Sequence, residues 1–345
     1  MKAPTTGGIN MDDVILMSHG GGGRRTQQLL RDIILPPLAN PILAQMDDAA
    51  CLTLAGANVA VTTDSYVIRP LFFPGGDIGR LCVCGTVNDL VMQGAVPCYL
   101  TLGLIMEEGL PLRDLAAIIR SIATTAQEAG VQIIAGDTKV VERGSGSGLF
   151  VNTTGLGLRR AGVDTHIANA RPGDAVLVTG TLGDHGVAVL SQREGIAFET
   201  HLISDVAPLN GLIGALLEAA PGIHSLRDPT RGGVAAALND VAQTADVGIR
   251  LDEGALPIRP EVRGACNLLG LEPLSVANEG KALVFCAPAD VARALAALRA
   301  HPLGREAGRI GTVIAAPRGK VLLRTRLGGE RLVEMPLGDD LPRIC

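Results

Sequence analysis

Three aspartates in the first half of the sequence stand within or at the end of apolar segments: Asp64 ends AVTTD, Asp89 lies in GTVNDL, and Asp137 ends IIAGD. A carboxylate in apolar surroundings is costly unless it is paired or bound to a cation. Singly, each fits a cap or a turn. Together they predict a Mg²⁺ site, because Mg²⁺ prefers a few carboxylates completed by water and substrate phosphates. Asn88 could add an amide oxygen, and Lys139 would place a point charge against a phosphate.

A glycine-rich loop, Gly20, Gly21, Gly22 and Gly23, follows His19 and precedes an expected helix start. Backbone N–H groups approach phosphates closely where no Cβ intervenes. The loop is not a Walker A motif, since no Gly-Lys-Ser/Thr follows, and no strand precedes it as in a dinucleotide-binding fingerprint. Taken alone, it fits a flexible N-terminal loop and a solvated histidine.

Two motifs in the second half combine charge with glycine. RDPTRGG (227–233) places Asp228, Arg231 and Gly232 before a helix, whose N-terminus favours anions. NEG puts Glu279 in front of an expected strand. Taken singly, the first fits a charged surface loop and the second a turn.

The sequence ends in LPRIC, so its last residue is the thiol Cys345. The segment from Pro336 to Cys345 spans about 33 Å when extended, at roughly 3.3 Å per residue. Such an arm can cross a domain or reach a partner protein. On its own it also fits an inert chain end.

The elements that must position these residues form an α+β pattern with a boundary near residue 160. The apolar pattern predicts strands at 60–68, 99–106, 131–141 (broken at Gly136), 148–158, 248–252, 282–286, 310–315 and 320–326, and an edge strand before the tail. It predicts helices at 77–95, 112–130, 183–194, 209–219, 231–245, 260–269 and 289–300. We therefore expect domains at 1–160 and 161–333 and a mobile tail at 334–345.

Composition excludes several classes of function. The chain has 345 residues, a formal charge of −5, no Trp, two Tyr and five Phe. The scattered basic residues and scarce aromatics argue against a nucleic-acid groove. No apolar run reaches the roughly 20 residues of a membrane span. Seven cysteines and an N-terminus unlike a signal peptide favour a reduced, cytoplasmic protein.

The ordered series HGGGG, TTDSYVIRPLFFPGGDIGRLCVCGTVNDL, GDTKVV, RDPTRGG, NEG and LPRIC resembles the HypE family of hydrogenase maturation proteins. The likeness runs from about residue 13 to the end. That family belongs to the PurM-like ATP-binding superfamily, which includes aminoimidazole ribonucleotide synthetase and selenophosphate synthetase. The terminal Pro-Arg-Ile-Cys distinguishes it from those relatives. About ten extra residues precede the usual start.

The resemblance implies a two-domain PurM-like fold and an ATP-dependent carbamoyl dehydratase. A carbamoyl group from HypF would be loaded onto Cys345 and dehydrated to a thiocyanate. The cyano group would then pass to iron on the HypC–HypD complex, for the [NiFe]-hydrogenase centre. The resemblance also implies a homodimer formed through the N-terminal halves.

The resemblance further implies roles for individual residues. Asp64, Asp89 and Asp137 would hold Mg²⁺, Lys139 would face the ATP phosphates, and the four glycines would close over the nucleotide. Glu279 is our hypothesis for the general base, with His19 as the alternative. The expected nucleotide-binding residues are Gly20, Gly21, Gly22, Gly23, Asp64, Asn88, Asp89, Asp137, Lys139, Asp228, Arg231 and Gly232.

Two competing functions are a selenophosphate-synthetase-like small-molecule kinase and a binding partner without ATPase activity. The kinase would need a reactive Cys near the N-terminus, yet the first cysteine is Cys51, after the glycine-rich loop. The intact Asp64, Asp89, Asp137 and Lys139 argue against the second.

Overall fold

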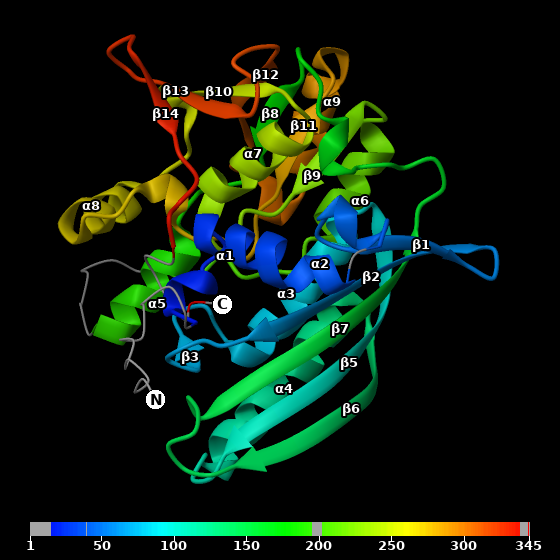
Figure 1. Ribbon diagram of the computed structural model, residues 1–345, viewed down its shortest axis with the longest axis vertical. Helices are drawn as coiled ribbons and strands as arrows, with labels where there is room; N and C mark the ends of the chain where they lie inside the picture. The colour runs from blue at the N-terminus through cyan, green and yellow to red at the C-terminus, as the bar shows by residue number, and fades with distance from the viewer. Residues whose placement is uncertain (1–14, 39, 195–201, 339–343, 345) are drawn as a thin grey trace, which may run out of the picture.

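The computed structural model describes residues 15–38, 40–194, 202–338 and 344. Its first half is built on a five-stranded sheet (Figure 1). The pairing is antiparallel except between the last two strands, which run parallel. The strand order is β1 (Ala50–Leu54), β2 (Ala57–Tyr66), β7 (Leu149–Arg159), β5 (Ala95–Glu107) and β6 (Gln132–Val141).

One face of this sheet is covered and the other is open. Alternate residues of β7 are buried or more exposed, as expected of a strand with one packed face. The packed face contacts α3 (Ile78–Met92), beside which lies α4 (Leu112–Ala129). Asp77 caps α3 by accepting the N–H groups of Gly79 and Arg80. α3 packs against the sheet, α4 and α6, and therefore has buried apolar residues on several sides. It also carries Asn88 and Asp89 into the interior.

The second half contains a seven-stranded sheet. Its inner strand β8 is buried along its whole length, because its alternate side chains enter two different cores. Ala175 and Leu177 join the larger core, which also contains residues of the first half, while Val176 and Val178 join the core beneath α7. The strand order is β14 (Glu330–Val333), β13 (Lys320–Arg324), β10 (Gly248–Asp252), β12 (Gly308–Ile314), β8 (Ala175–Val178), β11 (Leu283–Cys286) and β9 (Ile223–Arg227).

Helices on the second sheet also join the two halves. α6 (Asn210–Ala219) packs on α9 (Val291–Ala300) and contacts α3 and β5 of the first half. The other helices of this half are α5 (Asp184–Glu194), α7 (Gly233–Thr244) and α8 (Pro260–Leu269). The short pair β3 (Phe72–Phe73) and β4 (Gly76–Asp77) contacts α5 and α3, respectively.

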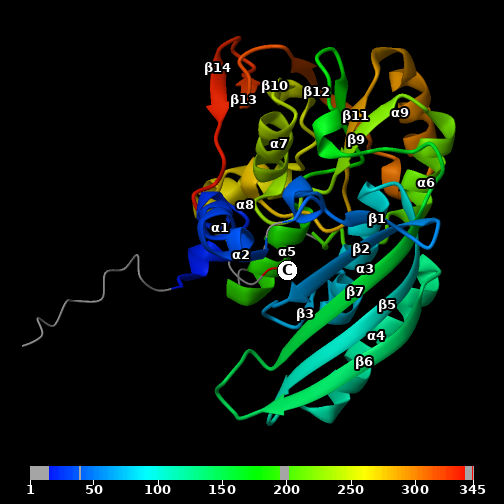
Figure 2. The ribbon, with the colours of Figure 1, turned by 45° about the vertical axis from the view of Figure 1, so that its right-hand side comes forward.

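An N-terminal helical segment lies between the halves (Figure 2). It consists of α1 (Arg24–Leu29), a π-helical turn (Leu30–Ile34) and α2 (Leu35–Leu38). The backbone N–H groups of Arg24 and Arg25 donate to the carbonyls of Pro336 and Leu337, at 2.9 and 3.4 Å. The start of α1 therefore holds the root of the tail.

The expected helices are present as α3 to α9, and the predicted edge strand is β14 at one edge of the second sheet. The break in the strand expected at Gly136 is wrong, because β6 runs through this residue. Glycine is needed there for close packing, since a Cβ would lie 2.6 Å from the Leu102 carbonyl oxygen. The helix start expected after Gly23 is present as α1, whereas its continuation to Leu38, β1 and β9 were not predicted. No helix among the described residues is long and apolar enough to cross a membrane.

Candidate active site

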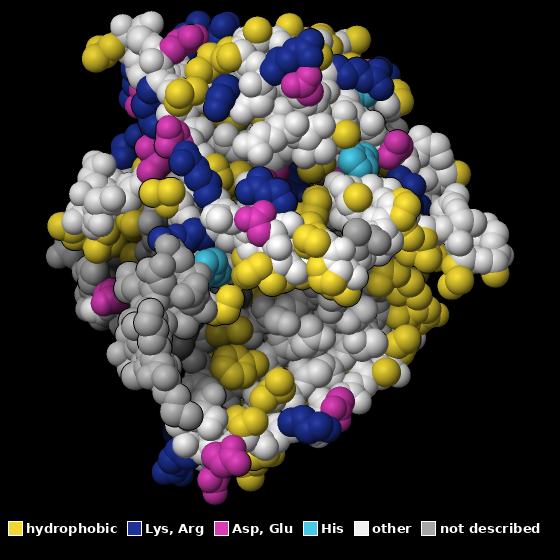
Figure 3. Space-filling model, in the orientation of Figure 1, with side chains coloured by type: hydrophobic (Ala, Val, Ile, Leu, Met, Phe, Trp, Pro, Cys, Tyr) yellow, Lys and Arg dark blue, Asp and Glu magenta, His cyan; other side chains and the backbone are white. Residues whose placement is uncertain are grey.

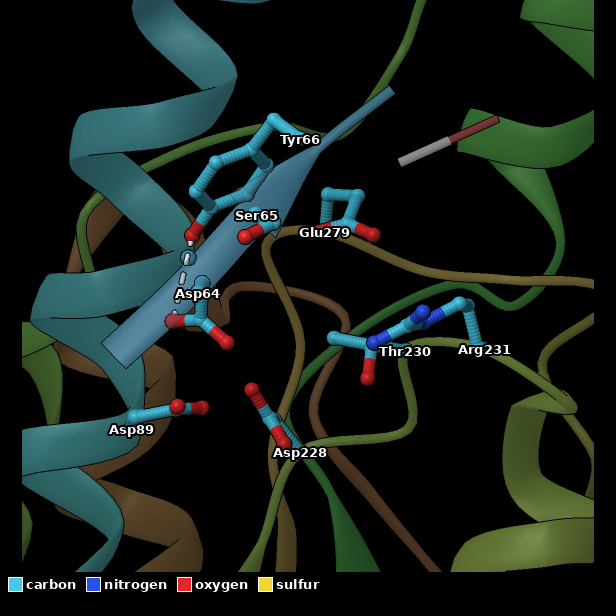
Figure 4. Close-up of a pocket in the computed structure, with 9 residues that line it drawn as sticks. Asp64, Ser65, Tyr66, Asp89, Asp228, Thr230, Arg231 and Glu279 are labelled. Atoms are coloured by element: carbon cyan, nitrogen blue, oxygen red, sulfur yellow. Dashed lines mark hydrogen bonds between the residues drawn. The ribbon is translucent and has the colours of Figure 1, made fainter. Parts of the chain in front are cut away.

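A pocket between the two halves gathers acidic side chains from both (Figure 4). Asp64 comes from β2 and Asp89 from α3. Asp228 and Arg231 come from the loop between β9 and α7, and Glu279 from the loop that precedes β11. The carboxylates of Asp64, Asp89 and Asp228 point toward one another in Figure 4. The structure thus brings together residues that are up to 215 positions apart (279 minus 64) in the sequence.

Asp48, Asp89 and Asp228 form a compact carboxylate cluster. One ligand oxygen from each lies within 4.8 Å of the others. Burial raises the pKa of both Asp89 and Asp48 well above the ordinary range, and the neighbouring carboxylates raise it further, although Arg227 acts against this at Asp48. Burial raises the pKa of Asp228 to about 6. Three buried carboxylates that repel one another form a donor set suited to a divalent cation.

Unsatisfied oxygen atoms support the same interpretation. Among the residues that the structure describes, Asp48 Oδ2 and Asp228 Oδ2 have no hydrogen-bond partner. A buried oxygen without a partner is costly, and a bound cation would remove that cost. The residues present therefore fit Mg²⁺, through Asp48, Asp89 and Asp228.

Asp64 borders this cluster and is held by hydroxyl groups. Its Oδ2 accepts from Tyr66 Oη at 3.4 Å and from Thr86 Oγ1 at 3.2 Å. Thr62 Oγ1 donates to Asp89 Oδ2 at 2.8 Å. Burial raises the pKa of Asp64, and its hydrogen bonds partly counter that rise. The hydroxyl contacts fix both carboxylates in orientation.

Arg227 supplies the positive charge behind the cluster. Its guanidinium lies 2.5 Å from Asp48 Oδ1 and 3.3 Å from Asp240 Oδ2. Gln27 of α1 donates to the other Asp240 oxygen at 2.6 Å. This half-buried network ties the N-terminal segment to the second half and holds Asp48 at the pocket.

Glu279 is the most deeply buried acid of the pocket. Its side chain is 3% exposed, and Oε1 has no hydrogen-bond partner within the described parts of the chain. Burial raises its pKa well above the ordinary value, with further contributions from Asp228 and Asp205. Its backbone is fixed from both sides, since its N–H donates to Asp205 Oδ1 at 3.1 Å and its carbonyl accepts from Asn88 Nδ2 at 3.3 Å.

Asn88 has different partners from those expected of a metal ligand. Its amide oxygen accepts the Leu209 N–H at 2.8 Å, and its amide nitrogen donates to Ala207 O and Glu279 O. All of these partners belong to the second half or to the segment that leads into α6. Asn88 therefore braces the pocket from behind.

A groove of about 880 Å³ leads to the carboxylates. It lies between the α1–α2 segment and the sheet formed by β1, β2 and β7. Apolar side chains of Leu35, Leu38, Ile42 and Leu43 line it on one side, and its polar end holds Asp48, Asp64 and Asp89. Figure 3 shows hydrophobic side chains gathered above the hollow between this segment and the sheet.

The glycine-rich loop lies against Arg231 and the tail. Arg231 Nη1 donates to Gly20 O at 3.2 Å, and a Cβ on Gly22 (φ +74°) would lie 3.0 Å from the Arg231 carbonyl oxygen. A Cβ on Gly23 would lie 2.3 Å from Pro336 O. Gly232, at φ +75°, is the N-cap residue of α7. His19 Nδ1 accepts the Leu16 N–H within its own turn, so the structure does not bring His19 to the carboxylates.

Asp137 and Lys139 are not brought to this pocket within one chain. Both are exposed on the edge strand β6, where Lys139 Nζ lies 2.8 Å from Asp137 Oδ2. Lys139 lowers the pKa of Asp137 through their hydrogen bond. Within one chain, the structure therefore groups Asp48 and Asp228 with Asp89, and a role of Asp137 in metal binding stays a prediction.

Asp48 and Arg227 were missed as site residues. Asp48 lies in MDDAA before β1, and adjacent acids before a strand resemble an ordinary turn. Arg227 was visible only as the first letter of RDPTRGG. The available signal was that each of the two residues stands beside an acid: Asp48 follows Asp47, and Arg227 precedes Asp228. Cys345, expected to carry the reacting thiol, lies outside the described residues.

Comparison with known proteins places this fold and pocket in a class. Residues 46–159 match the N-terminal domain of AIR synthase related proteins, and residues 171–324 match their C-terminal domain. The chain belongs to the AIR synthase related proteins.

Within that class, the chain belongs to the HypE family. Carbamoyl dehydratase HypE of Cupriavidus necator is 52% identical over 330 residues, which are 95% of this chain and 94% of that protein. A crystal structure of HypE with ATP is 46% identical with a TM-score of 0.81, covering 96% of this chain and 100% of the other. HypE in a HypE–HypF complex superposes with a TM-score of 0.85 at 46% identity, covering 89% and 99%.

Proposed function

We propose that the protein is an ATP-dependent carbamoyl dehydratase that converts an S-carbamoyl group on Cys345 into a thiocyanate, the source of a cyanide ligand in [NiFe]-hydrogenase maturation. The observation that carries this proposal is the buried Glu279 carboxyl beside the aspartate cluster, whose Oε1 has no hydrogen-bond partner among the described residues. The relatives named carbamoyl dehydratase, at 52% identity over nearly the whole chain, support it.

The reaction needs activation of a poor leaving group. The carbamoyl oxygen attacks the γ-phosphorus of ATP and ADP leaves, which gives an O-phosphorylated imidate. Loss of the remaining N–H proton and of phosphate then forms the C≡N bond. The oxygen of the carbamoyl group therefore ends in phosphate, and the protons released from nitrogen pass to a base and to solvent.

The groove and the cluster suit ATP. The apolar wall of Leu35, Leu38 and Ile42 offers a surface for the adenine ring of ATP. The acidic end suits the phosphates, which arrive with their counterions. Bound Mg²⁺ would neutralise phosphate charge. Asp48, Asp89 and Asp228 would hold it, with Asp64 at their border. Arg231 and the backbone of Gly20 to Gly23 would contact the phosphates.

Glu279 would take the proton from nitrogen. Its buried position raises its pKa, which makes the carboxylate a stronger base when it is ionised. The two backbone hydrogen bonds to Asp205 and Asn88 keep it in place. His19, the alternative, has no comparable position at the pocket.

Association of two chains would give Asp137 and Lys139 a role at the ATP site. Apolar side chains are exposed along the first sheet, among them Ile134 (59%) and Val140 (68%) of β6. An exposed apolar sheet edge favours pairing with a second copy. We propose a homodimer through this sheet, in which Asp137 and Lys139 of one protomer complete the ATP site of its partner.

Partners and location follow from the same proposal. HypF would load the carbamoyl group, and the HypC–HypD complex would accept the cyanide. The HypE–HypF crystal structure at 46% identity supports the first partner. We place the protein in the cytoplasm, and we divide it into domains at 1–160 and 161–333 with a mobile tail at 334–345. The two sheets, whose strands end at Arg159 and begin again at Ala175, support that division.

Intact-mass measurement tests the proposed function. The protein is incubated with HypF, carbamoyl phosphate and ATP-Mg²⁺. We expect the mass of one carbamoyl group to be gained and then the mass of one water to be lost. A Cys345→Ser variant should remain unmodified. A modification that persists in this variant, or a carbamoyl group that ATP never converts, would overturn the proposal.

A further inference from the structure

Ile344, the residue before Cys345, is seated in the interior. Its side chain is 4% exposed and belongs to the larger hydrophobic core. Its carbonyl oxygen lies 2.6 Å from His185 Nε2. An isoleucine near the end of a chain gains such burial only where a pocket receives it, so this position is a built docking site for the tail.

His185 is held for this contact by the segment before α6. It is fully buried at the start of α5, and its ring meets that of Phe73 edge-on, with centroids 5.4 Å apart. A carbonyl oxygen accepts only, so Nε2 carries the proton. Nδ1 then accepts from the Ser204 hydroxyl at 2.8 Å, and that oxygen in turn accepts the Val206 N–H at 3.1 Å.

The surroundings of His185 lead directly to the proposed base. Burial lowers the pKa of His185, which favours the neutral ring with its proton on Nε2. Ser204 is followed by Asp205, whose carboxylate pairs with Lys281 at 3.0 Å and accepts the Glu279 N–H. One short segment, 204–206, therefore touches both the tail pocket and the backbone of Glu279.

The tail is also held at its root. The start of α1 binds the Pro336 and Leu337 carbonyls, and a Cβ on Gly338 would lie 2.6 Å from Ser18 Cβ. The tail thus has two described attachments, one at residues 336–338 and one at Ile344.

We propose that His185 is a positioning residue for dehydration: its Nε2–H binds the Ile344 carbonyl and so holds the tail where the group on Cys345 can react. This inference rests on the proposed dehydratase function. His185 is not among the residues that line the pocket or the groove, and it would act by fixing the residue next to the one that carries the carbamoyl group. Loading by HypF, which needs the thiol outside, does not use the contact.

Single-turnover dehydration of the carbamoylated full-length protein tests this. His185→Ala should slow conversion at saturating ATP by about fivefold to tenfold, the change expected for one lost hydrogen bond. The KM for ATP of this variant, and the rate at which HypF loads it, should stay within about twofold of the wild-type values. His185→Gln, whose amide N–H can reach a carbonyl, should recover most of the rate. Ile344→Ala should behave like His185→Ala, whereas Leu337→Ala, on a 71% exposed tail side chain, should not.

A second measurement does not depend on the reaction. Maleimide labelling of Cys345, read on the peptide that follows Glu334, should be faster in His185→Ala and Ile344→Ala than in the wild type. The buried Cys82 and Cys84 report loss of the fold and should stay unlabelled. Wild-type rates of both dehydration and labelling in His185→Ala would overturn the inference. If the carbamoylated wild type is never dehydrated, the proposed function fails. Labelling alone then decides whether the contact between His185 and Ile344 holds the tail.

Discussion

The Asn88 side chain, on a helix of the first half, donates to the backbone carbonyl of Glu279 in the second half at 3.3 Å. Its amide oxygen accepts the Leu209 N–H at the same time. One buried amide therefore sets both the distance between the halves and the position of the proposed base.

Asn88→Ala should lower stability and catalysis together. It leaves buried backbone groups without partners, so the free energy of unfolding should fall by about 2–4 kcal/mol. Dehydration should fall more than ATP affinity, because Glu279 loses its support. Denaturant titration and single-turnover rates measure the two effects. Asn239→Ala is the matched control, since Asn239 is a buried amide bound to Ala235 O and Val333 O; it should lose stability without the specific loss of rate.

Glu279→Gln should separate dehydration from the other steps. The variant should bind ATP and accept the carbamoyl group, yet dehydrate about 10²- to 10⁴-fold more slowly, which is the usual contribution of a general base. Because burial raises the pKa of Glu279, the wild-type rate should rise with pH as the carboxyl ionises. The variant should lack that rise. A variant that dehydrates at the wild-type rate would remove Glu279 from the mechanism.

The carboxylate cluster should make stability depend on pH when ATP and Mg²⁺ are absent. The pKa of Asp228 is about 6 in the folded chain and roughly 3.9 when unfolded. Its protonated form favours the folded state, so the contribution is present at low pH and is lost as pH rises from about 4 to 6, by about 3 kcal/mol.

Asp228→Asn should remove that dependence. The wild-type free energy of unfolding minus that of the variant, measured from pH 4 to pH 7, isolates the Asp228 contribution from other titrating groups. The variant should also lose Mg²⁺-dependent ATP binding, which calorimetry can measure. A difference that stays constant with pH would show that Asp228 is not perturbed as described.

Mixing two inactive variants should show whether Lys139 acts across a dimer. Lys139→Ala and Asp89→Asn are each expected to be inactive. If Lys139 completes the partner's site, half of randomly paired dimers are mixed, each has one intact site of two, and about a quarter of wild-type activity returns. If Lys139 acts in its own chain, mixing restores nothing. Each variant alone is the control, and subunit exchange is verified by mass under native conditions.

The sequence predicted the acids that lie within regular apolar elements and missed those that depend on long-range contacts. Asp64 and Asp89 interrupt apolar runs, and such interruptions are visible locally. Asp48 pairs with Arg227, from a strand of the other half. Asp137 shows the same local pattern as Asp64, but a pattern along one strand cannot say that the strand is at an open edge. Gly20 to Gly23 likewise indicated an accessible backbone, without showing that the tail root would bind beside it.

The anchored root at Pro336 and Leu337 has a consequence for affinity. Cys345 is eight residues beyond Leu337, so the thiol stays within about 26 Å of this fixed point, at roughly 3.3 Å per residue. Tethering of this kind gives an effective concentration on the order of millimolar. The pocket around His185 therefore needs only a weak intrinsic affinity for Ile344 to stay occupied. Such weak affinity would let the tail leave quickly enough to meet a second protein in every cycle.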